Sequence, residues 1–138
     1  MVTCQDIMDV MEEIAPRHLA EDWDNPGLLV GSPAARVERV FVCLDVSDAA
    51  VAQAAACGAQ LIISHHPLIF RPLKALNTAE PLGRRIASLL AHGIAAFAAH
   101  TNLDIAEGGV NEVLARAVGL SHLSAFVITA QAADGHTQ

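Results

Sequence analysis

The stretch Leu61-Ile62-Ile63-Ser64-His65-His66-Pro67-Leu68 decides how we expect the chain to fold. Its apolar run ends at a small polar residue, two adjacent histidines and a proline, a pattern typical of a buried strand followed by a turn. Pro67 restricts His66 to extended geometry and disfavours a helix there. Neighbouring side chains on a regular strand point to opposite faces, so both imidazoles can serve one site only if the chain leaves strand geometry here.

Strands alternate with helices on both sides of this stretch. Apolar strands are predicted at residues 28–31, 39–44, 60–64 and 94–99. Helices are predicted from Thr3 to Pro16, with Thr3 and Asp6 as a capping box, and at about 48–57, 80–92 and 110–118. This alternation predicts one layered α/β domain over residues 1–129, with a mixed, largely parallel sheet flanked by helices. A last strand is expected at 124–129, and the polar tail at 130–138 is expected to fray.

The composition indicates an ordered globular protein without a nucleic-acid partner. The chain has 138 residues, of which 53% are hydrophobic, which is enough for a domain with its own core. Its formal charge of −7 disfavours binding to a phosphate backbone, since Lys and Arg drive that binding. We find neither a membrane-spanning segment nor a signal peptide. An odd count of three cysteines, with no C-x-x-C pair, indicates reduced thiols and a cytoplasmic location.

Three of the predicted strands end in polar side chains. Asp45 follows the first, His65 and His66 follow the second, and a segment from His100 to Asp104, which we expect to be a loop, follows the third. In a parallel sheet these ends lie at one edge, where open α/β sheets bind their ligands. Imidazole and carboxylate groups are ligands for Zn, Mn, Fe or Ni. His65, His66 and Asp104 are therefore the predicted metal ligands, and His100 is either a further ligand or a group that orients one.

Each of these residues also has a purely structural interpretation. His65 and His66 could simply be turn residues, and Asp104 could cap a turn. Asp45 belongs either to the surroundings of the metal or to the cap of the next helix. The coincidence of an adjacent histidine pair with a His-Thr-Asn-x-Asp segment, both directly after buried strands, favours a site. His92, at a predicted helix C-terminus, is assigned only an interaction with the helix dipole. No cysteine has a basic neighbour that would activate it, so no Cys–His catalytic pair is expected.

Three motifs together resemble a known family. They are Asp24-Asn25-Pro26-Gly27-Leu28-Leu29-Val30-Gly31, Ser64-His65-His66-Pro67-Leu68 and His100-Thr101-Asn102-Leu103-Asp104. In order and spacing they resemble the NIF-three-like family, whose members are also described as GTP cyclohydrolase 1 type 2 homologues. The resemblance extends from residue 3 to about 120. It implies an α/β fold with a mixed sheet, a dinuclear metal centre and a toroidal homo-hexamer.

The same resemblance implies roles for individual residues. His65, His66 and Asp104 correspond to metal ligands, Asp104 as the bridging one, and His100 lines the site. In the family the remaining ligands come from a His-x-x-x-Glu segment in a second half. No His-x-x-x-Glu occurs in this sequence, so we expect an incomplete metal site in this chain.

Two functional hypotheses follow from these motifs. The first is a metal-dependent hydrolase acting on a small molecule or nucleotide, in which two cations about 3.5–4 Å apart activate water and His100 transfers a proton. The family name suggests ring opening of a purine nucleotide, while phosphoester and amide-like bonds are equally open. The second is a non-catalytic metal-binding interaction or regulatory protein. An iron oxygenase with two histidines and one carboxylate is a lesser option, because the helix-rich pattern does not support its usual β-barrel scaffold.

Overall fold

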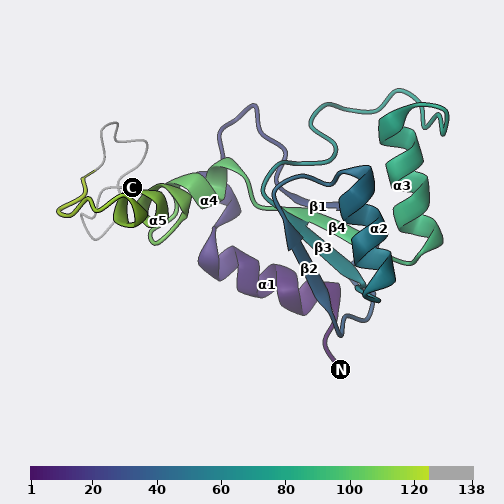
Figure 1. Ribbon diagram of the computed structural model, residues 1–138, viewed down its shortest axis with the longest axis horizontal. Coiled ribbons are helices and arrows are strands. Elements are labelled where there is room, and N and C mark those ends of the chain that lie inside the picture. The colour runs from purple at the N-terminus through teal and green to yellow at the C-terminus, as the bar shows by residue number, and fades with distance from the viewer. Residues whose placement is uncertain (125–138) are drawn as a thin grey trace.

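A four-stranded mixed sheet forms the centre of the computed structural model, which describes residues 1–124 (Figure 1). The strands are β1 (Gly27–Val30), β2 (Val40–Cys43), β3 (Leu61–Ser64) and β4 (Ala95–Ala98), in the spatial order β1-β4-β3-β2. β2, β3 and β4 run parallel, and β1 is antiparallel to β4. The predicted layered α/β architecture is therefore confirmed. The strand expected at 124–129 and the tail at 130–138 lie outside the described residues, apart from Ser124.

Helices cover both faces of the sheet. In chain order, the helices are α1 (Cys4–Ile14), the 3₁₀ turn η1 (Arg17–Leu19), α2 (Asp48–Ala56), α3 (Pro81–Ala91), α4 (Thr101–Ile105) and α5 (Val110–Ala117). In Figure 1, α2 and α3 lie on one side of the sheet and α1 lies on the other, while α4 and α5 extend away from its edge. The predicted capping box is confirmed, because Thr3 Oγ1 accepts from the Asp6 N–H while the Thr3 N–H donates to the Asp6 carboxylate. Within the described part of the chain, no helix is long and apolar enough to cross a membrane.

The alternation of side chains along the strands builds two cores. Ile62 and Ala96 belong to the core beneath α2 and α3, and Leu61, Ala95 and Phe97 belong to the core that Cys4 of α1 helps to close. Strand residues two apart share a face, so the unbroken apolar run of β3 supplies both cores. This accounts for the continuous hydrophobic character of the central strands.

The register of the parallel strands brings their carboxyl ends level. Cys43 of β2 pairs with Ser64 of β3, and Ser64 pairs with Ala98 of β4. Gly27, the first residue of antiparallel β1, also pairs with Ala98. The residues that follow β2, β3 and β4 and those that precede β1 therefore meet at one edge of the sheet.

The segment from His100 to Asp104 differs from the expected loop, because Thr101–Ile105 forms the short helix α4. Its first backbone N–H, from Thr101, donates to Asp24 Oδ2 at 3.0 Å. A carboxylate at this position satisfies a helix N-terminus and its partial positive charge. Since that carboxylate lies 77 residues away in sequence, local sequence signals could not reveal the helix.

Gly31 directly follows β1, and neither its backbone conformation nor the space around it suits a residue with a side chain. Its φ is +103°, and a Cβ there would lie 2.7 Å from the Cβ of Ala95 and 2.9 Å from its Cα. Gly93 also has a positive φ, +65°, but a Cβ there would meet nothing within 4 Å. A substitution at Gly93 therefore tests backbone strain alone, whereas a substitution at Gly31 tests backbone strain together with a steric clash with β4.

We expect Gly31→Ala to lower the free energy of unfolding by about 2–4 kcal/mol, because it adds a clash with β4 to the conformational strain. Gly93→Ala, as the matched control, should cost about 1 kcal/mol for the left-handed backbone alone. Urea denaturation followed by far-UV circular dichroism measures both. Equal losses for the two variants would contradict the close packing of β1 on β4.

Candidate metal centre

A turn after β3 places two imidazoles on the same side of the sheet edge. The buried Ser64 hydroxyl donates to the carbonyl of His66 at 2.9 Å. The backbone N–H groups of His65 and His66 donate to the carbonyls of Cys43 and Leu44 at 3.2 and 3.0 Å. These bonds take the chain out of strand geometry, and the two ring centroids lie only 5.0 Å apart. The turn expected after Ser64 is present.

His100, at the N-terminus of α4, brings a third imidazole to this pair. Its ring centroid lies 5.1 Å from that of His65 and 5.6 Å from that of His66. Within residues 1–124, His65, His66 and His100 form a group in which one possible ligand atom of each lies within 4.8 Å of the others. We call these three residues the imidazole triad. Three nitrogen donors at this separation are close enough to bind one metal ion after small side-chain adjustments.

His65 and His66 each use Nδ1 to contact an oxygen. Nδ1 of His65 lies 3.1 Å from the backbone carbonyl of Ala99, which can only accept, so this nitrogen carries the proton. Nδ1 of His66 lies 2.8 Å from Oδ1 of Asp45. In both rings the proton then resides on Nδ1, and the lone pair of Nε2 is free. Ligating histidines in metal sites are oriented by this kind of contact.

The same arrangement holds His100. Its Nδ1 lies 2.8 Å from Oδ1 of Asp24, a carboxylate that is fully buried. Asp24 also accepts from the backbone N–H groups of Asn25 and Thr101, at 2.7 and 3.0 Å, and from the Thr101 hydroxyl. Burial works to raise the pKa of Asp24, but the hydrogen bonds from Thr101, His100 and Asn25 outweigh it and hold that pKa below its usual range. Asp24 therefore stays ionised and fixes the proton of His100 on Nδ1.

Asp104 is not one of the three residues of the triad, but its carboxylate lies next to it. Its Oδ1 is 3.6 Å from Nε2 of His65, which is too long for a hydrogen bond. Two ligands bonded at about 2.1 Å to one tetrahedral ion are about 3.4 Å apart. The spacing thus suits a nitrogen and an oxygen that share a cation. One turn of helix separates Asp104 from His100, so both side chains reach the same edge.

The remaining residues considered from the sequence have other surroundings. The helix-cap interpretation of Asp45 is wrong, because Ser47 is the N-cap of α2 and accepts from the N–H of Ala50. His92 ends α3, and its Nδ1 lies 2.8 Å from the carbonyl of Ser88. Burial, and then the charge of Asp45, raise the pKa of the Cys43 thiol, so it is not an activated nucleophile.

Asp24 belongs to one of the motifs found in the sequence, but the sequence did not indicate that it lies at the candidate metal site. It precedes β1, and only the antiparallel pairing of β1 with β4 brings it to the edge that follows β4. A strand direction is not readable from a four-residue apolar run. The available signal was Asp24 itself, an acidic residue three positions before the first residue of β1.

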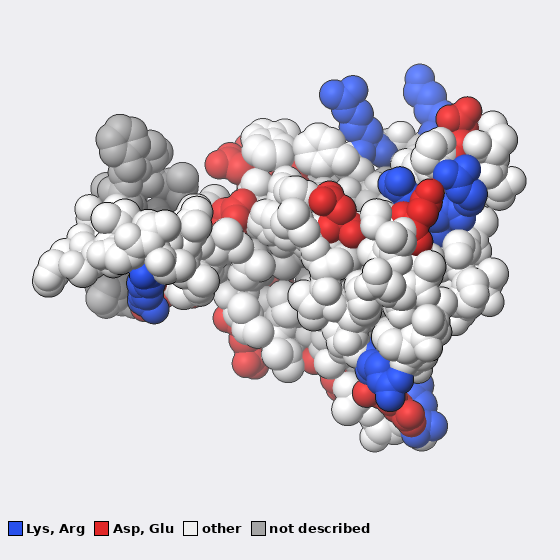
Figure 2. Space-filling view, viewed as in Figure 1, with Lys and Arg blue, Asp and Glu red and all other residues white. Residues whose placement is uncertain are grey.

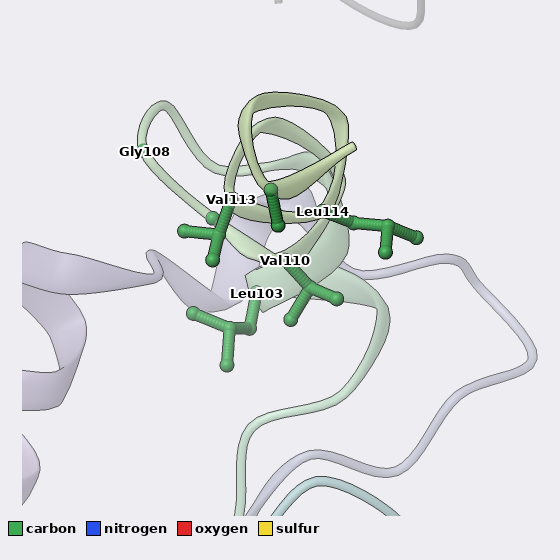
Figure 3. A pocket seen from close by; sticks show the side chains of 7 residues that line it. Leu103, Gly108, Val110, Val113 and Leu114 are labelled. Carbon is green, nitrogen blue, oxygen red and sulfur yellow. The ribbon is translucent and has the colours of Figure 1, made fainter. Parts of the chain in front are cut away.

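An apolar pocket of about 450 Å³ lies between α4 and α5, apart from the imidazole triad (Figure 3). It is lined by Leu103, Gly108, Gly109, Val110, Val113, Leu114 and Ala117. None of these side chains offers a nitrogen, oxygen or sulfur ligand. The pocket is therefore unsuited to hold a metal, and the donor chemistry remains at the edge of the sheet.

Residues 2–134 match the family model described as Duf34/NIF3 (NGG1p interacting factor 3). The GTP cyclohydrolase 1 type 2 homologue of Bacillus subtilis is 42% identical over 128 residues, which cover 93% of this chain and 34% of that protein. The homologue of Halalkalibacterium halodurans is 39% identical over 125 residues, covering 91% of this chain and 34% of that protein. The chain thus spans about a third of the length of these relatives.

Solved structures show the same fold. A Bacillus cereus protein related to NIF3 superposes with a TM-score of 0.90 at 41% identity, over 94% of this chain and 35% of that one. Reduced HcgD from Methanocaldococcus jannaschii superposes with a TM-score of 0.80 at 30% identity, over 88% of this chain and 48% of that one.

We expect Asp24→Asn to destabilise the protein by about 1–3 kcal/mol, since an amide replaces one acceptor oxygen by a donor and leaves an N–H group unpaired. The variant should also populate the His100 tautomer that carries its proton on Nε2. Urea denaturation measures the first effect, and ring-nitrogen chemical shifts in NMR measure the second. Asp22→Asn, at an exposed acid of the same loop, is the control. Unchanged stability in Asp24→Asn would contradict the role given to this carboxylate.

Proposed function

The chain belongs to the Duf34/NIF3 family, and we propose that it binds a divalent metal through His65, His66 and Asp104, with His100 beside the metal, and acts as a metal-dependent hydrolase. One observation supports this proposal most strongly. His65 and His66 each engage an oxygen through Nδ1, which leaves their Nε2 lone pairs free beside the carboxylate of Asp104, while the Nε2 lone pair of His100 is free to accept a proton. Such a donor set, with a carboxylate alongside, suits Zn, Mn, Fe or Ni.

Metal uptake should depend on His65 and Asp104. We expect His65→Ala and Asp104→Ala each to weaken metal binding at least about 100-fold, since each removes a proposed ligand while leaving both cores intact. Isothermal titration with Zn and Mn, together with elemental analysis, measures this. His92→Ala removes an imidazole far from the triad and should change nothing. Unchanged stoichiometry in His65→Ala would show that the ligand assignment is wrong.

A bound divalent ion would supply a water of lowered pKa and polarise a substrate oxygen. The protein itself would position the substrate and move the proton. His100 is suited to proton transfer, because Asp24 fixes its orientation and holds its proton on Nδ1, which leaves Nε2 to accept another. The relatives named GTP cyclohydrolase 1 type 2 homologues suggest a purine nucleotide as substrate, and phosphoesters are the alternative.

The charges favour a small substrate over a nucleic acid. The described arginines include several that pair with acids: Arg84 and Arg85 with Asp48, Arg36 with Glu38, and Arg116 with Glu112. On the face drawn in Figure 2, the basic side chains are scattered over the top, the right and the left of the molecule, several of them beside acidic ones, and they form no continuous stripe. A phosphate backbone needs such a stripe of unpaired cations.

We expect His100→Gln to lower kcat by about 10²–10⁴-fold on GTP or a generic phosphoester, because glutamine cannot carry the proton. The metal content should stay that of the wild type, as measured by elemental analysis of the assayed sample. Loss of the metal together with activity would instead make His100 a ligand. No turnover by the wild type with saturating Zn, Mn and Fe would contradict the hydrolase proposal.

A non-catalytic metal-binding interaction or regulatory protein is the second candidate. The donors by themselves support it, since His65, His66 and Asp104 could hold an ion that has only a structural or sensing role. It would bind metal in the titrations above and show no turnover.

Self-association is part of the proposal. Exposed apolar side chains on α5, among them Val113 and Leu114, support it, because α5 buries none of its residues in the single chain. The solution mass, measured alongside the elemental analysis, tests for a homo-oligomer.

A further inference from the structure

Two large aromatic side chains stand exposed beside the imidazole triad. Trp23 is 60% exposed and Phe70 is 44% exposed, and their ring centroids lie 6.0 Å apart at an interplanar angle of 63°. Tryptophan and phenylalanine gain most of their stabilising contribution from burial, so leaving both open sacrifices packing energy. Exposed apolar surface next to convergent polar groups is typical of a binding site.

Both aromatic rings contact the triad through the same residue. The ring of His100 lies 6.3 Å from Trp23 at 78° and 6.5 Å from Phe70 at 87°, centroid to centroid. His100 is in turn 5.1 Å from His65. A flat molecule that stacks on one of these rings and contacts the other would therefore lie beside the imidazole of His100.

The two loops that carry these rings are fixed to each other. Asn25 donates through Nδ2 to the carbonyl of Ile69 at 2.6 Å, which ties the residues next to Trp23 to those next to Phe70. The backbone N–H of Asn25 also donates to Asp24, the residue that holds His100. The relative placement of Trp23, Phe70 and His100 is thus set before any ligand arrives, which lowers the entropic cost of binding.

We propose that Trp23 and Phe70 form a stacking platform that binds a planar aromatic or heteroaromatic ring of the ligand, such as a nucleobase, against His100. The platform would hold the ring of the substrate on which the proposed hydrolase acts. This proposal rests on the proposed function only for the chemistry at the triad. Trp23 and Phe70 are inclined by 63°, so a planar ligand ring would stack on the face of one of them and meet the other at its edge. Stacking of this kind accepts any base, because every base has a π-face.

Tryptophan fluorescence tests the platform directly, because Trp23 is the only tryptophan and the chain has no tyrosine. Guanosine and adenosine should quench this emission saturably in the 138-residue chain, both with EDTA and with Zn. Ribose, which lacks a base, should not. The proposal would be overturned if neither guanosine nor adenosine quenched the emission, with EDTA or with Zn.

Phe70→Leu should weaken nucleoside binding about tenfold, since stacking contributes that order of affinity per base. Leu73→Ala, an exposed apolar change in the same segment, is the matched control and should bind as the wild type does. Equal affinity in Phe70→Leu and the wild type would overturn the role of Phe70. Titration with Zn separates the two proposals: normal metal uptake without quenching removes the platform alone, and quenching without metal uptake removes the metal site alone.

Discussion

The buried carboxylate of Asp24 is the constraint on which the edge of the sheet depends. A buried charge is costly unless every lone pair finds a donor, and here Thr101, Asn25 and His100 provide those donors. Through these bonds the loop before β1 is joined to the start of α4, the orientation of His100 is fixed, and the loop that carries Trp23 is held next to the imidazoles. Removing the charge would disturb the helix, the tautomer and the aromatic surface together.

Much of the fold could be predicted from the sequence because its signals are local. The Thr3–Asp6 capping box lies within one turn of helix, and the apolar run of β3 ends at a proline-linked histidine pair. The alternation of strands and helices then limited the architecture to a largely parallel sheet with its polar strand ends at one edge. The helix α4 escaped prediction because its N-terminus is satisfied by a distant side chain.

The composition of the candidate site was harder to predict than its location. The role of His100 depends on which of its two ring nitrogens is free. Its contact with Asp24 decides this, because that contact occupies Nδ1. The sequence indicated a loop between His100 and Asp104, whereas the helix α4 begins at Thr101 and places both residues next to His65. The same long-range contacts decide that Asp45 orients His66 instead of capping α2.

The anchors of the three imidazoles come from separate stretches of the chain: the end of β4, the segment after β2 and the loop before β1. These stretches meet only in the native state, so an unfolded chain presents no comparable set of nitrogens. Any ion captured there would add its binding free energy to that of folding, by an amount that grows with the logarithm of the ion concentration. The supply of metal in the surroundings would then set what fraction of the chains is folded.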